Sequence, residues 1–399
     1  MSRIDELIQT LCPYGVEYKP LGELGLRNKG TSITAGQMKT IRVDDGPIRV
    51  FAGGRTVADV AEGSVPAKDV VRVPSIIVKS RGHIGFTYYD RPFTHKAEIW
   101  SYSISHRDVD QKYVFQYLLT QVESLQEIAR GTSVKLPQLG VRDTDTLRIP
   151  IPPIEVQREI VRVLDLFATL EAQLEAELEA RGRQYVYYRD SLLNFRDAKE
   201  VRWARMGDLA TIVRGASPRP IQASLTDAID GVPWIKIGDV AASGKYITGT
   251  AERVTPEGAC KSRRVHPGDF VLSNSMSFGR PYISKIEGCI HDGWLAISDF
   301  SASYVPDFLY HLLRSAPVQA ELARRAGGGT VQNLNADIVK SIVIPVPSLG
   351  EQRRIANILD KFDALVNDPA IGLPAELAAR RKQHEYYRDR LLTFEEAVA

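Results

Sequence analysis

The chain has 399 residues, of which 44% are hydrophobic and 25% charged, and this length exceeds what one hydrophobic core usually serves. The formal net charge is only +2, and no stretch approaches the roughly 18 uncharged apolar residues of a membrane span, so we expect several domains and no membrane partner. Three cysteines without a C-x-x-C pair argue against a disulfide framework or a cysteine-based zinc site. Together with a start that lacks a signal peptide, they predict a cytoplasmic protein.

The first part of the chain, residues 1–148, alternates short β-rich runs with turns. "SIIVKS" (75–80) and "EIWSYSIS" (98–105) are typical of strands, and one long helix is expected over 110–129. This mixture of short strands and a late helix predicts a domain of the α+β class.

Residues 149–195 are expected to form a long helix after Pro152 and Pro153, which end a strand and permit a helix start. The apolar residues follow a spacing of 4, 3, 4, 3 and 4, which is the seam of a coiled coil. These residues are Val156, Ile160, Val163, Phe167, Leu170 and Leu174.

The remaining chain repeats this order. Residues 196–343 again alternate strand-like runs with turns and end in a helix at 306–325, and residues 344–399 predict the second long helix. "IPIPPIEVQREIVRVLDLFATL" (149–170) and "IPVPSLGEQRRIANILDKFDAL" (344–365) agree at ten of twenty-two positions, and "YYRDSLLNF" (187–195) recurs as "YYRDRLLTF" (386–394). The second copy carries four extra residues, which we place in the segment 367–376, where Pro369, Gly372 and Pro374 interrupt the helix.

The two halves therefore predict a duplicated unit of one domain followed by one helix. Fainter matches support this, since Gly30 and Gly215 follow similar strands at the same offset. Two related seams in one chain pack most simply antiparallel, with an internal pseudo-two-fold axis. Such a pair of helices suits a spacer that holds two domains apart, although it is also compatible with a helical hairpin that measures no distance.

Motifs that would carry chemistry are absent from the sequence. It contains no phosphate loop, no glycine-rich dinucleotide turn, no G-x-S-x-G elbow and no histidine pair with metal-ligand spacing. We therefore predict no catalytic residues, no metal site and no cofactor in this chain, while an enzyme with an unrecognised site remains an alternative.

Polar and basic side chains gather at matching turns of the two blocks, and each block carries a net charge of +3. Side chains of these types read base edges or hold phosphates, although each alone could belong to an ordinary solvated loop. The candidate DNA-binding residues are Lys79, Arg81, His83, Thr132, Lys135, Asn274, Ser275, Ser277, Arg280, Thr330 and Gln332. Different tips on two copies of one domain would read different sequences.

The order of two variable blocks and two near-identical helices resembles the specificity subunit of type I restriction–modification enzymes. "IPIPPIEVQREIVRVLD", "IPVPSLGEQRRIANILD", both "YYRD-LL-F" endings and the opening "IDELIQTLCPYGVEYKPLGEL" carry this resemblance, which covers the whole chain. It implies two target recognition domains that each read half of a bipartite double-stranded DNA site, and helices that fix the gap between the halves. It also implies docking of two methyltransferase subunits that carry S-adenosylmethionine, and the joining of restriction subunits.

On this resemblance we assign partner binding to the repeated Gln-Arg pairs of the helices, Gln157 with Arg158 and Gln352 with Arg353. The chain itself would be a non-catalytic subunit. The alternative from another class is a scaffold whose coiled coil recruits partner proteins and whose domains bind protein instead of DNA.

Overall fold

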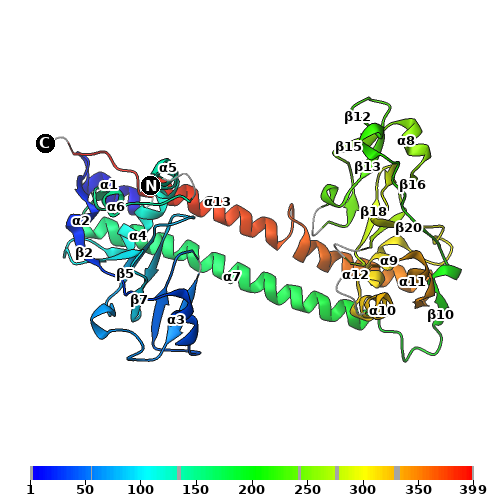
Figure 1. The fold of residues 1–399 in the computed structure, drawn as a ribbon, viewed down its shortest axis with the longest axis horizontal. Helices are drawn as coiled ribbons and strands as arrows, with labels where there is room; N and C mark the ends of the chain where they lie inside the picture. Colours follow the sequence, from blue (N-terminus) through cyan, green and yellow to red (C-terminus); the bar gives the residue numbers. More distant parts are fainter. Residues whose placement is uncertain are drawn as a thin grey trace. The chain divides into compact units, whose positions relative to one another are not determined.

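The computed structural model describes residues 3–54, 56–132, 136–240, 244–274, 278–327 and 333–397, without the side chain of Thr132 (Figure 1). The chain divides into two compact units, each of which contains parts of both long helices. Unit 1 comprises Met1–Ala172 with Arg380–Ala399, and unit 2 comprises Gln173–Ala379. The sequence-based boundaries at 148, 195 and 343 differ from this division, because they treat each long helix as a separate segment between the domains.

The described residues of unit 1 form three small sheets. A four-stranded antiparallel sheet has the order β2-β8-β5-β6, a three-stranded sheet has the order β4-β3-β7 with β3 and β7 parallel, and β1 pairs with β9. The strands are β1 (Glu17–Pro20), β2 (Gly25–Asn28), β3 (Ile48–Phe51), β4 (Val57–Val60), β5 (Ser75–Lys79), β6 (Gly85–Tyr89), β7 (Phe93–His95), β8 (Trp100–Ile104) and β9 (Arg148–Ile151). The helices are α1 (Arg3–Leu11), α2 (Leu21–Leu24), α3 (Ala35–Thr40), α4 (Gln111–Thr120), α5 (Val122–Thr132) and α6 (Val141–Asp145).

Unit 2 repeats this plan with additions. Its sheets have the orders β11-β20-β17-β18-β14 and β12-β15-β13-β19-β16, and β10 pairs with β21 as β1 pairs with β9. The strands are β10 (Arg202–Arg205), β11 (Thr211–Arg214), β12 (Leu225–Thr226), β13 (Val232–Ile235), β14 (Tyr246–Ile247), β15 (Glu252–Val254), β16 (Arg263–Val265), β17 (Phe270–Ser273), β18 (Pro281–Ser284), β19 (Gly288–Ile290), β20 (Trp294–Ser298) and β21 (Val343–Val346). The helices are α8 (Pro256–Cys260), α9 (Pro306–Arg314), α10 (Ala316–Ala326) and α11 (Ala336–Ser341).

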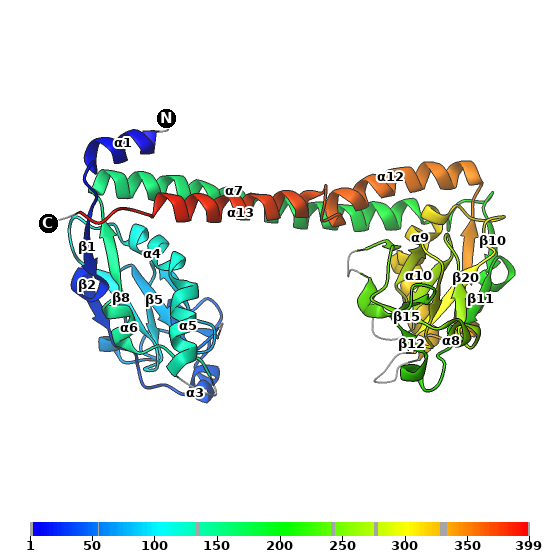
Figure 2. The same cartoon turned by 90° about the horizontal axis from the view of Figure 1, so that it is seen from above.

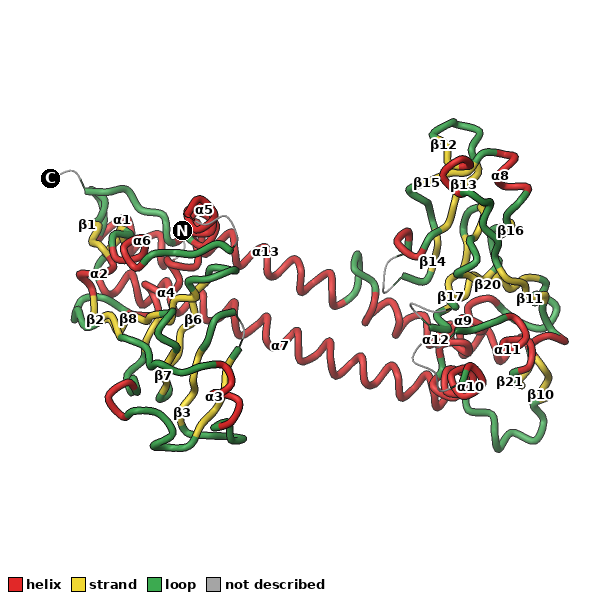
Figure 3. Tube along the Cα trace, in the orientation of Figure 1, coloured by secondary structure: helices red, strands yellow, loops and turns green. Residues whose placement is uncertain are grey.

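Strand pairing supports the predicted duplication in detail. The parallel pair β3–β7 has its counterpart in β13–β19, and the antiparallel series β2-β8-β5-β6 has its counterpart in β11-β20-β17-β18. Figure 3 shows the mixture of strands and helices in each unit, which confirms the α+β class. Unit 2 adds β14 at the outer edge of β18, a position that no strand takes beside β6 in the described part of unit 1.

The long helices are α7 (Ile154–Leu192), α12 (Leu349–Asn367) and α13 (Leu373–Leu391). Two strands, β9 and β21, come directly before α7 and α12, so the prolines end strands as expected. The predicted interruption of the second helix is confirmed, because α12 ends at Asn367 and α13 begins six residues later. In this break Gly372 lies so close to the carbonyl oxygen of Ala364 that a Cβ would approach it to 2.4 Å, and Ile371 is 79% exposed.

The helices pack antiparallel within each unit. In unit 1 the ring of Phe167 stacks on His384 and Tyr387, and in unit 2 the ring of Tyr188 stacks on Phe362. The predicted seam is wrong at Leu170, which is 47% exposed, because the neighbouring Glu171 turns inward and accepts a hydrogen bond from His384 Nδ1 at 2.7 Å.

Each hydrophobic core lies between the main sheet, the paired domain helices and the long helices. In unit 1 the core joins β5 and β8 to α4, α5 and α7, and in unit 2 it joins β17 and β20 to α9, α10 and α12. Figure 2 shows α1 on the side of α7 away from the main sheet of unit 1. The single helices expected over 110–129 and 306–325 are each two helices, and in unit 2 Pro317 marks the new start within the first turn of α10.

Candidate nucleic-acid and partner interface

The turn between β5 and β6 presents basic side chains on a well-held backbone in unit 1. Arg81 and His83 are exposed and Lys79 is partly exposed, so the structure brings these three predicted residues together. Gly82 has a φ of +74°, and its N–H donates to Pro137 O at 2.9 Å. The amide of Gln126 accepts from Ile84 N at 2.8 Å and donates to Gly82 O at 3.1 Å. The turn is therefore a fixed platform from which Arg81 and His83 project into solvent.

The matching turn of unit 2 is held in the same way but carries different side chains. Gln319 Nε2 donates to Gly279 O at 2.9 Å, as Gln126 does to Gly82. Asn274 is only 4% exposed, and its Nδ2 donates to Asp292 O at 3.0 Å. The Asn274 amide is thus used to hold the turn, and DNA contact by Asn274 stays a prediction that this burial does not favour.

Arg280 lies partly buried at the end of the same turn. Its guanidinium lies over the ring of Tyr282 at 5.5 Å from the centroid, and its Nε has no hydrogen-bond partner among the described residues. It remains a candidate, since a buried donor without an acceptor is costly unless a ligand or water supplies one. The other predicted residues, Lys135, Ser275, Ser277, Thr330 and Gln332, lie outside the described ranges, as does the side chain of Thr132.

Sequence reasoning missed a basic group around Tyr89. Arg49 and Arg91 approach the Tyr89 ring at 5.7 and 5.5 Å from its centroid, and Arg49 makes a two-fold ion pair with Asp59 at 2.7 and 2.8 Å. The hydrogen bonds from Arg49, with the added charges of Arg91 and Arg42, hold the pKa of Asp59 below its usual value. The three arginines and Asp59 together carry a net positive charge, which is favourable for contact with phosphates. No spacing in the sequence could indicate this group, because β3 and β6 belong to different sheets.

The glutamines assigned to partner binding have a different role. Gln157 and Gln352 are fully buried, and each amide joins the start of its long helix to the segment before α4 or α9. Gln157 Oε1 accepts from Asp110 N at 2.8 Å, and its Nε2 donates to the carbonyl oxygens of Asp108 and Pro152. Both amides are buried and hydrogen-bonded within the chain, so partner binding by the two glutamines stays a prediction that this burial does not favour. Arg158 and Arg353 are exposed.

Exposed aromatic side chains on the long helices are better suited to a partner. Tyr187 on α7 is 68% exposed and Tyr386 on α13 is 60% exposed, and the two occupy matching places in the repeated "YYRD" motif. Each ring meets its neighbouring tyrosine edge to face, at 5.5 and 5.4 Å between centroids. Tyrosines of this kind supply large contact area at low entropic cost in protein interfaces.

Within the described ranges, none of the helices combines the length and apolar character needed to cross a bilayer. The same residues contain no group of three or more His, Cys, Asp or Glu side chains that could hold a metal ion.

Comparison with known proteins gives one consistent family. The model of the type I restriction modification DNA specificity domain matches residues 13–180 and again residues 199–378. The chain is 29% identical over 412 residues to the EcoR124I/EcoR124II type I restriction enzyme specificity subunit of Escherichia coli, covering 99% of this chain and 98% of that one. It is 28% identical over 395 residues to a putative type I restriction enzyme specificity subunit of Haemophilus influenzae, covering 95% and 96%.

Solved structures share the fold. A chain from a study of complex assembly and conformational transition of the type I R-M system has a TM-score of 0.63 at 16% identity, with 96% of this chain and 98% of that chain covered. The S subunit of a type I restriction-modification system from M. genitalium has a TM-score of 0.56 at 15% identity, with 95% and 96% covered.

Proposed function

The chain belongs to the family of type I restriction modification DNA specificity proteins, and from this membership we propose that its two units each read one half of a split DNA site. The observation that carries the proposal is the duplication of one scaffold with different tips. The glutamine joints, strand pairing and turn supports recur, whereas the turn of unit 1 exposes Arg81 and His83 and the turn of unit 2 buries Asn274. A protein that recognises two different half-sites needs two similar domains whose turns carry different side chains.

DNA contact in unit 1 is assigned to the β5–β6 turn and to the arginines around Tyr89. We assign contact with base edges or phosphates to Lys79, Arg81 and His83, which are exposed or partly exposed, and contact with the DNA backbone to the positive charges of Arg42, Arg49 and Arg91. In unit 2 the corresponding candidate is Arg280, with Ser275, Ser277, Thr330 and Gln332 kept as predictions. Lys135 and Thr132 remain predictions for unit 1.

The long helices are assigned two tasks, setting the gap between the half-sites and docking two methyltransferase subunits. α7 is one continuous helix of 39 residues, which corresponds to about 60 Å at 1.5 Å per residue. Tyr187 and Tyr386, with Arg158 and Arg353, form two matching sets of exposed residues, as two copies of one partner would need.

The chain is the non-catalytic member of its complex, in keeping with its family. S-adenosylmethionine and the residues that transfer the methyl group are assigned to the methyltransferase subunits, and DNA cleavage to restriction subunits. A cytoplasmic location belongs to the same proposal, because the DNA to be read and the reduced thiols of Cys12, Cys260 and Cys289 are both consistent with it. A scaffold that binds only protein is not favoured by the family match.

The test is the methylation pattern of DNA treated with this chain in complex with methyltransferase subunits. We expect one split motif, with two specific halves separated by a gap of indifferent sequence. Exchanging residues 15–148 for another recognition domain should change one half only. A single continuous motif, or methylation without sequence preference, would contradict the proposal.

A further inference from the structure

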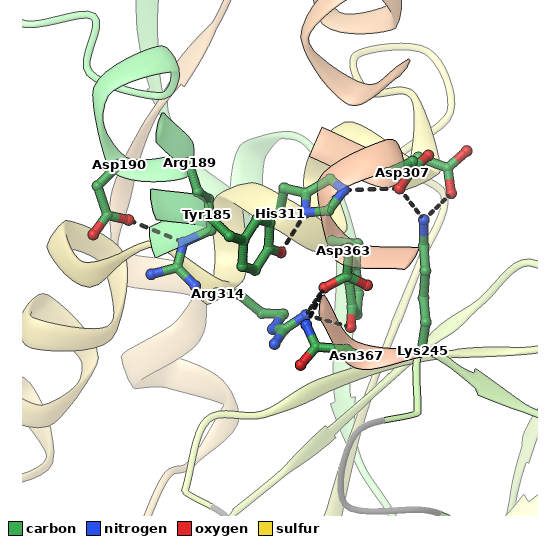
Figure 4. Close-up of polar contacts among 11 residues, drawn as sticks. Tyr185, Arg189, Asp190, Lys245, Asp307, His311, Arg314, Asp363 and Asn367 are labelled. Carbon is green, nitrogen blue, oxygen red and sulfur yellow. Dashed lines mark hydrogen bonds and ion pairs between the residues drawn. The ribbon is translucent and has the colours of Figure 1, made fainter. Parts of the chain in front are cut away.

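Unit 2 contains a partly buried polar network where its recognition domain meets the long helices (Figure 4). We call it the joint network. Its members are Tyr185 on α7, Lys245 before β14, Asp307, His311 and Arg314 on α9, and Asp360 and Asp363 on α12. All of these residues belong to unit 2, so the network is internal to that unit.

Lys245 is one of two cations in the network, and it pairs with two carboxylates. Its side chain is only 12% exposed, and its Nζ lies 2.7 Å from Asp307 and 2.6 Å from Asp360. Burial alone would lower the pKa of Lys245, but the hydrogen bonds to the two carboxylates raise it, so the ammonium group stays charged. Because Lys245 O also accepts from Ile283 N at 2.9 Å, the sheet of the recognition domain is connected directly to α12.

His311 extends the connection to α7. Its side chain is fully buried, with Nε2 2.8 Å from the carboxylate of Asp360 and Nδ1 3.2 Å from the hydroxyl of Tyr185. Burial lowers the pKa of His311, so the ring is neutral near pH 7. The carboxylate takes the single ring N–H, and Nδ1 then accepts the hydrogen bond from Tyr185.

Arg314 makes a second connection one turn further along α9. Its Nη1 lies 3.0 Å from Asp363 and donates to the Tyr310 hydroxyl at 2.7 Å. Asn367 Nδ2 donates to the same Asp363 carboxylate at 2.9 Å. The recognition domain is thus bound to both long helices by groups from two of its own parts, α9 and the segment before β14.

The corresponding place in unit 1 is built differently. Lys112 on α4 pairs with Asp165 on α7 at 2.9 Å, but their side chains are 44% and 47% exposed. Gln116 occupies the place of His311, and its Oε1 is buried without a hydrogen-bond partner among the described residues. Solvent screens an exposed pair, whereas buried and fully bonded groups restrict the angle between two elements.

We propose that the joint network fixes the second recognition domain on the long helices and so limits the gap between half-sites that the complex accepts. The inference rests on the proposed function and goes beyond it, because it assigns gap fidelity to a joint as well as to helix length. Lys245, His311 and Asp360 are positioning residues in this account. They determine the position of the second half-site along the DNA. The base sequence of that half-site is recognised by the loops of the domain.

Lys245→Met is the main test, since Asp360 keeps His311 as a partner and Asp307 is 38% exposed. The matched control is Lys112→Met, which removes the exposed pair of unit 1. Each variant is assembled with methyltransferase subunits, and methylation is measured on sites whose gap is the wild-type length or one base pair shorter or longer. Lys245→Met should weaken the discrimination between gaps by about tenfold, while preference within each half-site stays unchanged. Lys112→Met should discriminate as the wild type does.

Two further variants keep the test decisive. Lys245→Arg retains the charge and should restore gap discrimination, whereas a merely space-filling role would be met by methionine as well. If Lys245→Met fails to fold, His311→Gln, which introduces the residue of unit 1, is measured instead and should also accept altered gaps.

Unchanged gap discrimination in a folded Lys245→Met or His311→Gln variant would overturn the proposal. So would loss of sequence preference in the second half-site, because the network would then be needed to fold the domain and not to position it. A wild-type complex that shows no split motif would refute the proposed function itself, which is a different result.

Discussion

The side-chain amides of Gln157 and Gln352 make the same three hydrogen bonds in the two units. Gln352 Oε1 accepts from Val305 N at 2.8 Å, and its Nε2 donates to Ser303 O and Pro347 O at 2.9 Å, which repeats the bonds of Gln157 to Asp110, Asp108 and Pro152. The most conspicuous repeat in the sequence therefore marks the point where a recognition domain is attached to its helix.

Replacing Gln352 should destabilise the protein without a direct effect on a partner. Gln352→Ala leaves one buried N–H and two carbonyl oxygens without their partner, which we expect to cost about 2–4 kcal/mol of unfolding free energy. Urea unfolding of the full chain measures this. Arg353→Ala, at the exposed neighbouring position, should change the unfolding free energy by less than about 0.5 kcal/mol, and an equal cost for both variants would contradict this account.

Gly215 is predicted to tolerate no side chain. A Cβ at this position would lie 2.0 Å from His291 O, and the matching Gly30 would bring a Cβ to 2.5 Å from His95 O. Gly215→Ala should therefore cost about 2–4 kcal/mol, because backbone must move to admit the methyl group. Gly238→Ala is the control, since nothing lies within 4 Å of its Cβ position. Similar unfolding midpoints for the two variants would show that the close approach is not real.

Stability should depend on pH through His311. Because burial lowers its folded pKa, the contribution of His311 is fully present above its usual value of 6.5. Below pH 6.5 the unfolded chain takes up the proton first, so stability falls by up to about 1.4 kcal/mol per pH unit for one group. His311→Gln should flatten this decline between pH 6.5 and 5. His95 and His291 also have lowered pKa values, so the wild-type and variant curves must be compared as a difference.

Substitutions of Asn274 and Arg81 should have different effects, the first on stability and the second on DNA binding. Asn274→Ala removes a buried amide bonded to Asp292 O and is expected to cost about 1–3 kcal/mol of stability. Arg81→Ala should leave stability unchanged and weaken DNA binding by the complex by about 1–3 kcal/mol in one half-site. Chemical unfolding and DNA titration at fixed salt distinguish the two. Unchanged stability together with altered DNA specificity in Asn274→Ala would show that Asn274 contacts DNA.

Tyr187 and Tyr386 should each support one methyltransferase subunit. Truncating an exposed aromatic anchor typically costs about 2 kcal/mol or more in an interface, so each single variant should lose most of one bound subunit at micromolar concentration. Native mass measurement of the complex gives the number of subunits retained. Tyr14→Ala is the control, since Tyr14 is 89% exposed and is not part of the repeated motif in the sequence. Two subunits bound to the double variant with unchanged affinity would rule out the assignment.

The sequence was sufficient for the duplicated plan, because it depends on local periodicity and repeated motifs. The seam, the prolines before each helix and the break near Pro369 are visible within short windows. Even there, Leu170 was assigned to the seam on spacing alone, while the structure turns Glu171 inward toward His384. The sequence also does not indicate the breaks at Gln121 and Ser315, because the apolar periodicity continues across both positions.

The candidate site was less predictable, since burial and partners are tertiary properties. Asn274 and Arg81 have the same kind of polar surroundings in sequence, yet one is buried and the other exposed. Gln157 is a polar residue on a largely polar helix, so the sequence suggests that it is exposed. Its hydrogen-bond partners Asp110 and Asp108 lie 47 and 49 residues away in the chain, and the sequence does not indicate these contacts. Lys245 reaches Asp360 across 115 residues, and no spacing rule indicates that contact.

The break between α12 and α13 accommodates a difference in length between the two copies of the long helix. Phe167 and Tyr188 are 21 positions apart on α7, whereas their respective partners, Tyr387 on α13 and Phe362 on α12, are 25 positions apart. The surplus is taken up by a surface loop in which the Asp368 carboxylate accepts from Ala370 N and Ile371 N. An insertion of four residues in an unbroken helix would rotate everything after it by about 40°. Extruded as a loop, the same insertion leaves the rotational phase of the returning helix intact.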